Sequence, residues 1–250
     1  MRCMFVSVER VLDPRLQGKP VIVLSNNDGC AVSRSDEAKQ LGVAMGYPWF
    51  KLREKPHLAD LIVCSSNYEE CGAFSSRFHD TLATVSADAE TYSVDEVFVA
   101  LPHHEPAAVA ATAQTRVRTR TGLPAAVGIG PTKTLAKVAQ RQAKASGAGL
   151  TTWTSRDVDE LLTATPVSEV WGIVSRLNAR LAGLGIVTAA DLARADAGVI
   201  RRRWSVVVER TACELADVPC QPVGFTPKDR QQLMYSRMLG QPVSTRSEMR

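Results

Sequence analysis

Residues 93–98, with the sequence SVDEVF, constrain the fold of this chain more than any other segment. Two adjacent carboxylates, Asp95 and Glu96, stand at the head of an apolar, β-branched run that ends at Leu101. Side chains on a regular strand alternate between its two faces. The two acids can therefore share one metal site only if the backbone bends there, as at a strand end or a β-bulge. The alternative interpretation is a solvated strand end, where charged residues are common.

The composition is that of an ordinary globular protein, with 250 residues of which 45% are hydrophobic and 22% are charged. This length suffices for one large domain or two modest ones. No segment approaches the roughly 20 apolar residues of a membrane span, and the N-terminus does not resemble a signal peptide. The scattered cysteines lack zinc-ligand spacing, which favours reduced thiols in a cytoplasmic protein. The net charge of +4 is compatible with a phosphate-rich partner.

The first part of the chain predicts a short hairpin followed by a helix. Residues 21–24 and 30–33 predict two strands. The sequence NNDG between them favours a tight turn, because Asp-Gly tolerates the positive φ of such turns. Residues 36–41 predict a helix that stops at Gly42.

The middle of the chain predicts three longer helices. The first covers residues 68–82, ahead of the strand with the two acids. The second covers residues 107–121, ends at Gly122 and precedes a buried strand at residues 125–130. The third covers residues 132–144 and places Leu135, Val138 and Ala139 on one face.

Two lysines of the third predicted helix, Lys137 and Lys144, are seven residues apart and share a face. A solvated lysine face is the simplest interpretation of such a pair. The glycine spacing of a Walker A loop is absent from the preceding turn, which excludes that phosphate-binding motif.

The composition changes near Thr152, where we place a domain boundary. Beyond it the chain predicts short helices with tight connections. Capping-box sequences stand at residues 154–157 and 188–191, each at the expected start of a helix. Proline and glycine after Cys220 indicate a linker.

Residues 170–186 resemble a helix-hairpin-helix motif. In that motif a glycine turn and the next helix N-terminus present backbone amides to a DNA phosphate. Val174 stands where a second glycine is usual, so a weaker phosphate contact follows if valine cannot adopt the turn conformation. A plain helical turn between packed helices is the alternative. The candidate DNA-binding residues are Gly172, Ile173, Val174, Ser175 and Arg176.

Four segments together carry a resemblance to a known family. They are FVSVERVLDP at residues 5–14, GKPVIVLSNNDGC at 18–30, YSVDE at 92–96 and GIGPTKTLAK at 128–137. In order and spacing they resemble the UmuC-like branch of the Y-family translesion DNA polymerases, the catalytic subunit of bacterial DNA polymerase V. The string LSNNDGC is highly specific to this branch, and the resemblance extends over nearly the whole chain.

The resemblance implies a palm in which three carboxylates bind two Mg2+ ions, and Asp95 and Glu96 match two of the three. Phe5 matches the aromatic steric gate that excludes a ribose 2′-hydroxyl, although an ordinary core phenylalanine is the alternative. The positions that touch the incoming triphosphate are matched by Ser33, Lys39 and Lys144.

The implied architecture is an α/β (α+β) right-hand polymerase. Its expected parts are a palm at 1–13 and 67–153, fingers at 14–66, a helical thumb with the helix-hairpin-helix at 154–222, and a linker with the start of a little finger at 223–250. The third catalytic acid of the family aligns immediately before Met1, and relatives continue past Arg250. We therefore interpret the chain as truncated at both ends, through a late start assignment or a degraded gene, and expect impaired activity.

The implied function is magnesium-dependent, DNA-directed nucleotidyl transfer past damaged bases, in SOS mutagenesis and DNA repair. The implied partners are damaged or primer–template DNA, dNTPs, a UmuD-type subunit, RecA and the sliding clamp, with no membrane. Two other interpretations stay open. A non-catalytic remnant would bind DNA or a repair partner, and a nucleotidyl cyclase fits the acid pair but not the hairpin.

Overall fold

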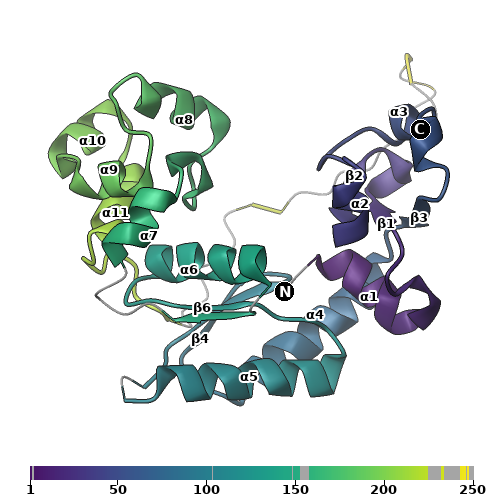
Figure 1. Cartoon of the computed structure of the whole chain (residues 1–250), viewed down its shortest axis with the longest axis horizontal. Helices are drawn as coiled ribbons and strands as arrows, with labels where there is room; N and C mark the ends of the chain where they lie inside the picture. The colour runs from purple at the N-terminus through teal and green to yellow at the C-terminus, as the bar shows by residue number, and fades with distance from the viewer. Residues whose placement is uncertain are drawn as a thin grey trace. The chain divides into compact units, whose positions relative to one another are not determined.

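The computed structural model describes residues 1, 3–102, 104–147, 149–152, 158–224, 232–233, 243–245 and 247 (Figure 1). The chain forms two compact units, which are built mainly from Cys3–Ser76 and from Arg77–Phe225. No helix in the described part of the chain combines the length and the apolar character that crossing a bilayer requires.

The first unit is built on a three-stranded sheet in the order β2-β1-β3. The central strand β1 (Val21–Leu24) is fully buried, runs antiparallel to β2 (Ala31–Arg34) and runs parallel to β3 (Ile62–Ser65). Helix α1 (Met4–Leu12) places Val6 in a small core with residues of β1. The expected strands are confirmed. The remaining helices are η1 (Pro14–Leu16), η2 (Asn26–Asp28), α2 (Asp36–Gln40), α3 (Trp49–Leu52) and η3 (Pro56–Leu58).

The turn between β1 and β2 differs from the expected tight turn. Residues Asn26–Asp28 form a 3-10 helix, and positive φ angles fall on Asn27 (55°) and Asp28 (53°). Gly29 has a φ of −72°, so the glycine is not the residue in the left-handed region. Asn and Asp tolerate that region better than most residues. In addition, Asp28 accepts a 2.8 Å hydrogen bond from Ser65 Oγ, which lies 37 residues away in the sequence.

The second unit contains two separate two-stranded sheets. Strand β4 (Ala89–Ser93) pairs antiparallel with β5 (Glu96–Val99), and β6 (Val127–Ile129) pairs parallel with β7 (Leu150–Thr152). Helices α5 (Pro106–Thr121) and α6 (Lys133–Ser146) both pack against β6 and β7, and Figure 1 shows β6 between them. The three predicted helices are confirmed, including α4 (Tyr68–Ala83), which begins in the first unit.

Strand β6 is half-buried, so the prediction of a buried strand was wrong. The physical reason is its pairing: among the described strands, β6 has a hydrogen-bonded neighbour, β7, on one edge only. Its other contacts come from the helices on its faces.

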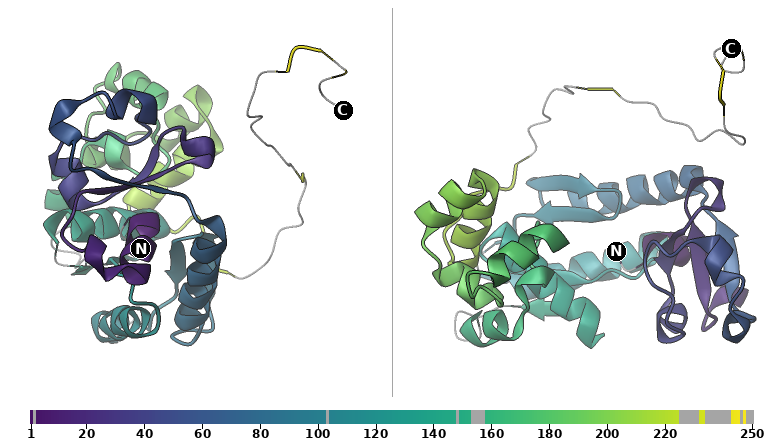
Figure 2. Two further views of the ribbon diagram at one scale, coloured as in Figure 1. Left: turned by 90° about the vertical axis from the view of Figure 1, so that its right-hand side faces the viewer. Right: turned by 90° about the horizontal axis from the view of Figure 1, so that it is seen from above.

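The helices of residues 158–215 gather into one bundle, drawn in green in Figure 2. Their apolar side chains and those of Leu135, Val138 and Ala139 on α6 form a single core, as the face of α6 predicts. The capping box at Thr188 and Asp191 is confirmed, whereas the one expected at residues 154–157 lies outside the described residues. The elements are α7 (Val158–Ala164), η4 (Val167–Glu169), α8 (Ser175–Ala182), α9 (Ala189–Arg194), α10 (Ala197–Arg203) and α11 (Val206–Leu215).

Two contacts fix the position of helix α6. A Cβ atom at Gly128 of β6 would lie 2.1 Å from the backbone nitrogen of Gln140, so only glycine permits this approach of strand and helix. At the first turn of α6, the buried carboxylate of Glu214 accepts hydrogen bonds from Thr134 N (3.0 Å) and Thr134 Oγ1 (2.6 Å). The side chain of Thr132 caps the helix by accepting from Leu135 N, and it donates to the backbone oxygen of Glu214.

Candidate functional site

The acid pair lies where the β4–β5 hairpin bends. Glu96 begins β5 and pairs with Ser93 at the end of β4, and the register shifts between Thr91 and Ser93. Asp95 lies in the connecting turn, where its Oδ1 accepts a 2.9 Å hydrogen bond from Ser93 Oγ. The bend that two adjacent acids require is therefore present in the backbone.

Two lysines of α6 contact the second acid of the pair. Lys137 Nζ donates a 2.7 Å hydrogen bond to Glu96 Oε1, and Lys144 Nζ lies 3.7 Å from the same oxygen. Burial alone would raise the pKa of Glu96, but the hydrogen bond and charge of Lys137 and the charge of Lys144 outweigh it and hold the pKa below its usual value. The prediction that Lys137 and Lys144 share a face is confirmed, and they form ion pairs instead of a solvated lysine face.

A second ion pair, which the sequence analysis missed, lies beside the first. Lys133 Nζ is 2.7 Å from both carboxylate oxygens of Glu90 on β4, and its side chain is only 7% exposed. Glu90 Oε2 also accepts a 3.1 Å hydrogen bond from the backbone nitrogen of Gly224. No local pattern marks Glu90, because Lys133 lies 43 residues away in the sequence.

The candidate DNA-binding turn has one residue that requires glycine. Gly172 has a φ of 85°, in the left-handed region. Val174 has a φ of −87° and a ψ of 164°, an extended conformation open to any residue, and it is the N-cap of α8. The weaker phosphate contact expected from a strained valine therefore has no basis in the backbone. Ile173 is buried, whereas Val174, Ser175 and Arg176 are exposed at the start of α8.

The first unit holds three of the predicted site residues. Phe5 on α1 is half-buried and meets the ring of Tyr68 edge to face, with centroids 5.8 Å apart. Ser33 on β2 is buried, and its Oγ accepts a 3.4 Å hydrogen bond from Val6 N. This contact ties Ser33 to α1.

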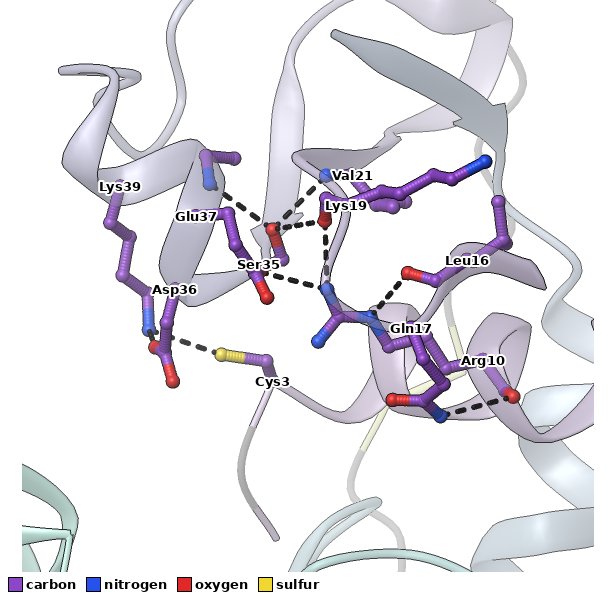
Figure 3. A network of polar contacts seen from close by, with 11 residues as sticks. Cys3, Arg10, Leu16, Gln17, Lys19, Val21, Ser35, Asp36, Glu37 and Lys39 are labelled. Carbon is purple, nitrogen blue, oxygen red and sulfur yellow. Dashed lines mark hydrogen bonds and ion pairs between the residues drawn. The ribbon is translucent and has the colours of Figure 1, made fainter. Parts of the chain in front are cut away.

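Lys39 on α2 lies in a polar network that connects α1, α2 and the intervening turn (Figure 3). Its Nζ is 2.7 Å from Asp36 Oδ1 and 3.2 Å from Cys3 Sγ. Partial burial lowers the pKa of Lys39, but the hydrogen bonds and charges of Asp36 and Cys3 outweigh it and raise the pKa overall. In the same network Arg10 of α1 donates a 2.8 Å hydrogen bond to Glu37 of α2.

The structure thus groups the predicted residues by unit. Asp95, Glu96 and Lys144 come together in the second unit, and Phe5, Ser33 and Lys39 belong to the first. Within the described residues, no three or more His, Cys, Asp or Glu side chains gather as a metal site would require.

The fold is that of the Y-family DNA polymerases, which confirms the expected α/β class. DinB from Sulfolobus solfataricus matches with a TM-score of 0.75 at 24% identity, over 89% of this chain and 67% of that one. The insertion ternary complex of Dbh DNA polymerase matches with a TM-score of 0.75 at 25% identity, over 86% of this chain and 65% of that one. A family model, the impB/mucB/samB family, matches residues 1–141. The chain belongs to this family.

Relatives of known sequence support the same assignment. Protein ImpB from Salmonella typhimurium is 41% identical over 254 residues, which is 98% of this chain and 60% of that protein. Protein UmuC from Salmonella typhimurium strain LT2 is 39% identical over the same shares of the two chains. The predicted resemblance to the UmuC-like branch is therefore confirmed. The chain spans 60% of the length of these relatives.

Proposed function

We propose that this chain forms the nucleotidyl-transferring part of a translesion DNA polymerase, which joins a dNTP to the 3′-hydroxyl of a primer paired with damaged DNA. The observation that carries the proposal is the acid pair at the β4–β5 bend, where Lys137 and Lys144 of α6 contact Glu96. Carboxylates and ammonium groups in one place suit phosphoryl transfer, in which the protein mainly positions groups and neutralises charge.

The donor set fits a hard divalent cation such as Mg2+. Asp95 and Glu96 offer carboxylate oxygens, which Mg2+ prefers. Both lysines contact Oε1 of Glu96, so its second oxygen is engaged by neither of them. When bound, Mg2+ would activate the primer hydroxyl and neutralise charge on the triphosphate. Asp95 and Glu96 are the residues that would hold it.

The remaining site residues take the roles that the family implies. In the second unit Lys144 would neutralise triphosphate charge. In the first unit Lys39, Ser33 and Phe5 are proposed as nucleotide-binding residues on the family resemblance alone. The turn from Gly172 to Arg176 would bind a DNA phosphate through exposed amides at the start of α8. The palm, fingers and thumb would follow the residue ranges expected from the sequence. A cytoplasmic location and association with a UmuD-type subunit, RecA and the sliding clamp belong to the same proposal.

Primer extension with Mg2+ on undamaged and abasic templates tests the proposal. We expect weak extension by this chain, in line with the impaired activity that the sequence predicts, and its loss by more than about 100-fold in Asp95→Asn and in Glu96→Gln. Asp88→Asn is the matched control, because Asp88 is an exposed acid just ahead of β4, and it should extend normally.

Two results would overturn the catalytic proposal. Extension that survives in both acid variants would place the chemistry elsewhere. DNA binding without any extension by the unaltered chain would favour the non-catalytic remnant, in which the hairpin binds DNA.

A further inference from the structure

Two aromatic side chains of the β4–β5 hairpin and one that is distant in the sequence form a cluster in the second unit. Tyr92 on β4, Phe98 on β5 and Trp171 before α8 have ring centroids 5.3–5.7 Å apart in all three pairs. Trp171 Nε1 donates a 2.9 Å hydrogen bond to Tyr92 Oη across 79 residues of sequence. Tyr92 is 45% exposed, so the cluster is not part of an ordinary buried core.

One end of the cluster is attached to the candidate DNA-binding turn. Trp171 directly precedes Gly172, whose left-handed φ of 85° turns the chain toward α8. On the other side of Trp171, Val170 is buried in the core of the helical bundle. The backbone between Val170 and Gly172 is therefore held by the core on one side and by the aromatic cluster on the other.

The other end of the cluster is attached to the lysines of α6. Lys137 Nζ lies 5.5 Å from the ring centroid of Tyr92, and Lys133 Nζ lies 5.1 Å from that of Phe98. These distances are within the range of cation–π attraction. Lys137 is also the hydrogen-bond donor to Glu96. The rings of Tyr92 and Phe98 thus each have an ammonium group on one face.

We propose that Trp171 and Tyr92, supported by Phe98, are positioning residues that hold the Gly172 turn in a fixed register to Glu96 and its lysines. The contact between Trp171 and Tyr92 would then set the position of the DNA phosphate at the turn relative to the reacting groups at the acid pair. The DNA part of this inference rests on the proposed function. The aromatic anchor itself rests on the ring contacts and on the hydrogen bond alone.

Hydrogen exchange of the backbone amides tests the anchor without DNA. Tyr92→Phe removes only the acceptor hydroxyl, and Trp171→Phe removes the indole donor. Each should raise the exchange rate of the Ile173 amide, which donates a 3.1 Å hydrogen bond to the backbone oxygen of Val170, by about fivefold. In the double variant the exchange rate should rise only slightly more than in the single variant with the larger effect, because both changes break the same hydrogen bond.

Matched controls distinguish the effect of losing this hydrogen bond from the effect of altering any aromatic residue. Trp204→Phe removes an indole N–H that has no hydrogen-bond partner among the described residues, and Tyr47→Phe alters a tyrosine of the first unit. Both should leave exchange of the Ile173 amide unchanged. Unchanged exchange in Tyr92→Phe, or equal effects in Trp171→Phe and Trp204→Phe, would overturn the anchor.

Salt dependence of primer–template affinity tests the functional part. A misplaced turn also displaces the exposed cation Arg176 from its phosphate, so Tyr92→Phe should lower the slope of log affinity against log salt by about one. A change in stability alone would leave that slope as it is. A reduced affinity with an unchanged slope would overturn the register role. An unaltered chain that binds no DNA would overturn the proposed function, and the exchange result would still decide the anchor.

Discussion

Lys137 of α6 and Glu96 of β5 form a 2.7 Å hydrogen-bonded ion pair in which both side chains are less than one-fifth exposed, at 18% and 19%. The pair joins the helix that packs on β6 to the hairpin that carries Asp95. The ion pair therefore connects the β4–β5 sheet to the helix that packs on the β6–β7 sheet. Its geometry predicts effects on stability that need no substrate to measure.

Replacing Lys137 by methionine should destabilise the protein by about 1–3 kcal/mol at neutral pH, because it leaves the largely buried carboxylate of Glu96 without its donor. Lys144→Met is the matched control. Lys144 lies 3.7 Å from the same oxygen and is 33% exposed, so its loss should cost less. Urea unfolding of the three proteins measures the difference. Equal losses in the two variants would contradict the assignment of the hydrogen bond to Lys137.

The pH dependence of this pair has a definite sign. Glu96 has a lowered pKa in the folded protein, so its stabilising contribution is present above the unfolded pKa and is lost as pH falls through the folded pKa. In Lys137→Met burial remains without the donor, and the pKa of Glu96 should rise. The stability gap between the two proteins should therefore shrink in acid. A gap that is constant from neutral pH to the acid limb would refute this account.

Glu214 should be among the most sensitive polar residues of the protein. Its side chain is fully buried and accepts from both Thr134 N and Thr134 Oγ1 at the first turn of α6. Glu214→Ala leaves two donors without an acceptor and creates a cavity, which should lower the free energy of unfolding by about 3 kcal/mol or more. Glu214→Gln keeps an oxygen acceptor and should cost clearly less. Urea unfolding distinguishes them, and equal losses would show that packing, not hydrogen bonding, is what matters.

Local chemistry explains which features the sequence could predict. Gly122 explains where α5 stops, and Thr132 explains where α6 begins, because capping residues act within a few residues of the helix terminus. The alternation of strand side chains sets a bend at the acid pair as the condition for a shared metal site, and the structure has that bend. The ion pair of Lys133 with Glu90 and the cap of α6 by Glu214 could not be predicted, because their partners lie 43 and 80 residues away.

Tertiary neighbours explain the two predictions that were wrong. The burial of β6 depends on how many strands pair with it, which its own residues do not encode. The turn after β1 placed its positive φ angles on Asn27 and Asp28, where a hydrogen bond from Ser65 of β3 stabilises Asp28. The roles of Phe5 and Lys39 came from the family resemblance alone, and they stay predictions.

Gly172→Ala should weaken DNA binding more than it weakens the fold. An alanine at φ 85° is strained by about 1–2 kcal/mol, and the turn would relax away from its present shape. Gly183→Ala is the matched control, because Gly183 has a φ of −63° and a Cβ there meets its nearest atom at 3.5 Å. Anisotropy of a labelled primer–template measures affinity. Similar losses in both variants would argue against a special role for Gly172.

The same assay tests the valine of the turn. Val174 is already extended and 65% exposed, so Val174→Gly removes no strain and should leave DNA affinity within about twofold. A large gain in affinity would show that the second glycine usual in this motif matters for a reason other than backbone conformation.

Gly128→Ala should be one of the most damaging small substitutions in the chain. The added Cβ would lie 2.1 Å from Gln140 N and 2.3 Å from the backbone oxygen of Ala136, and backbone atoms cannot turn aside as a flexible side chain can. Helix α6 would have to move off β6, which would also displace Lys137 from Glu96. We expect a loss of about 3 kcal/mol or more in urea unfolding. Gly72→Ala makes the same chemical change within α4 with nothing inside 4 Å, and it should stabilise by about 0.5–1 kcal/mol. If both alanines were tolerated equally, the direct packing of α6 on β6 could not be what fixes the position of the lysines.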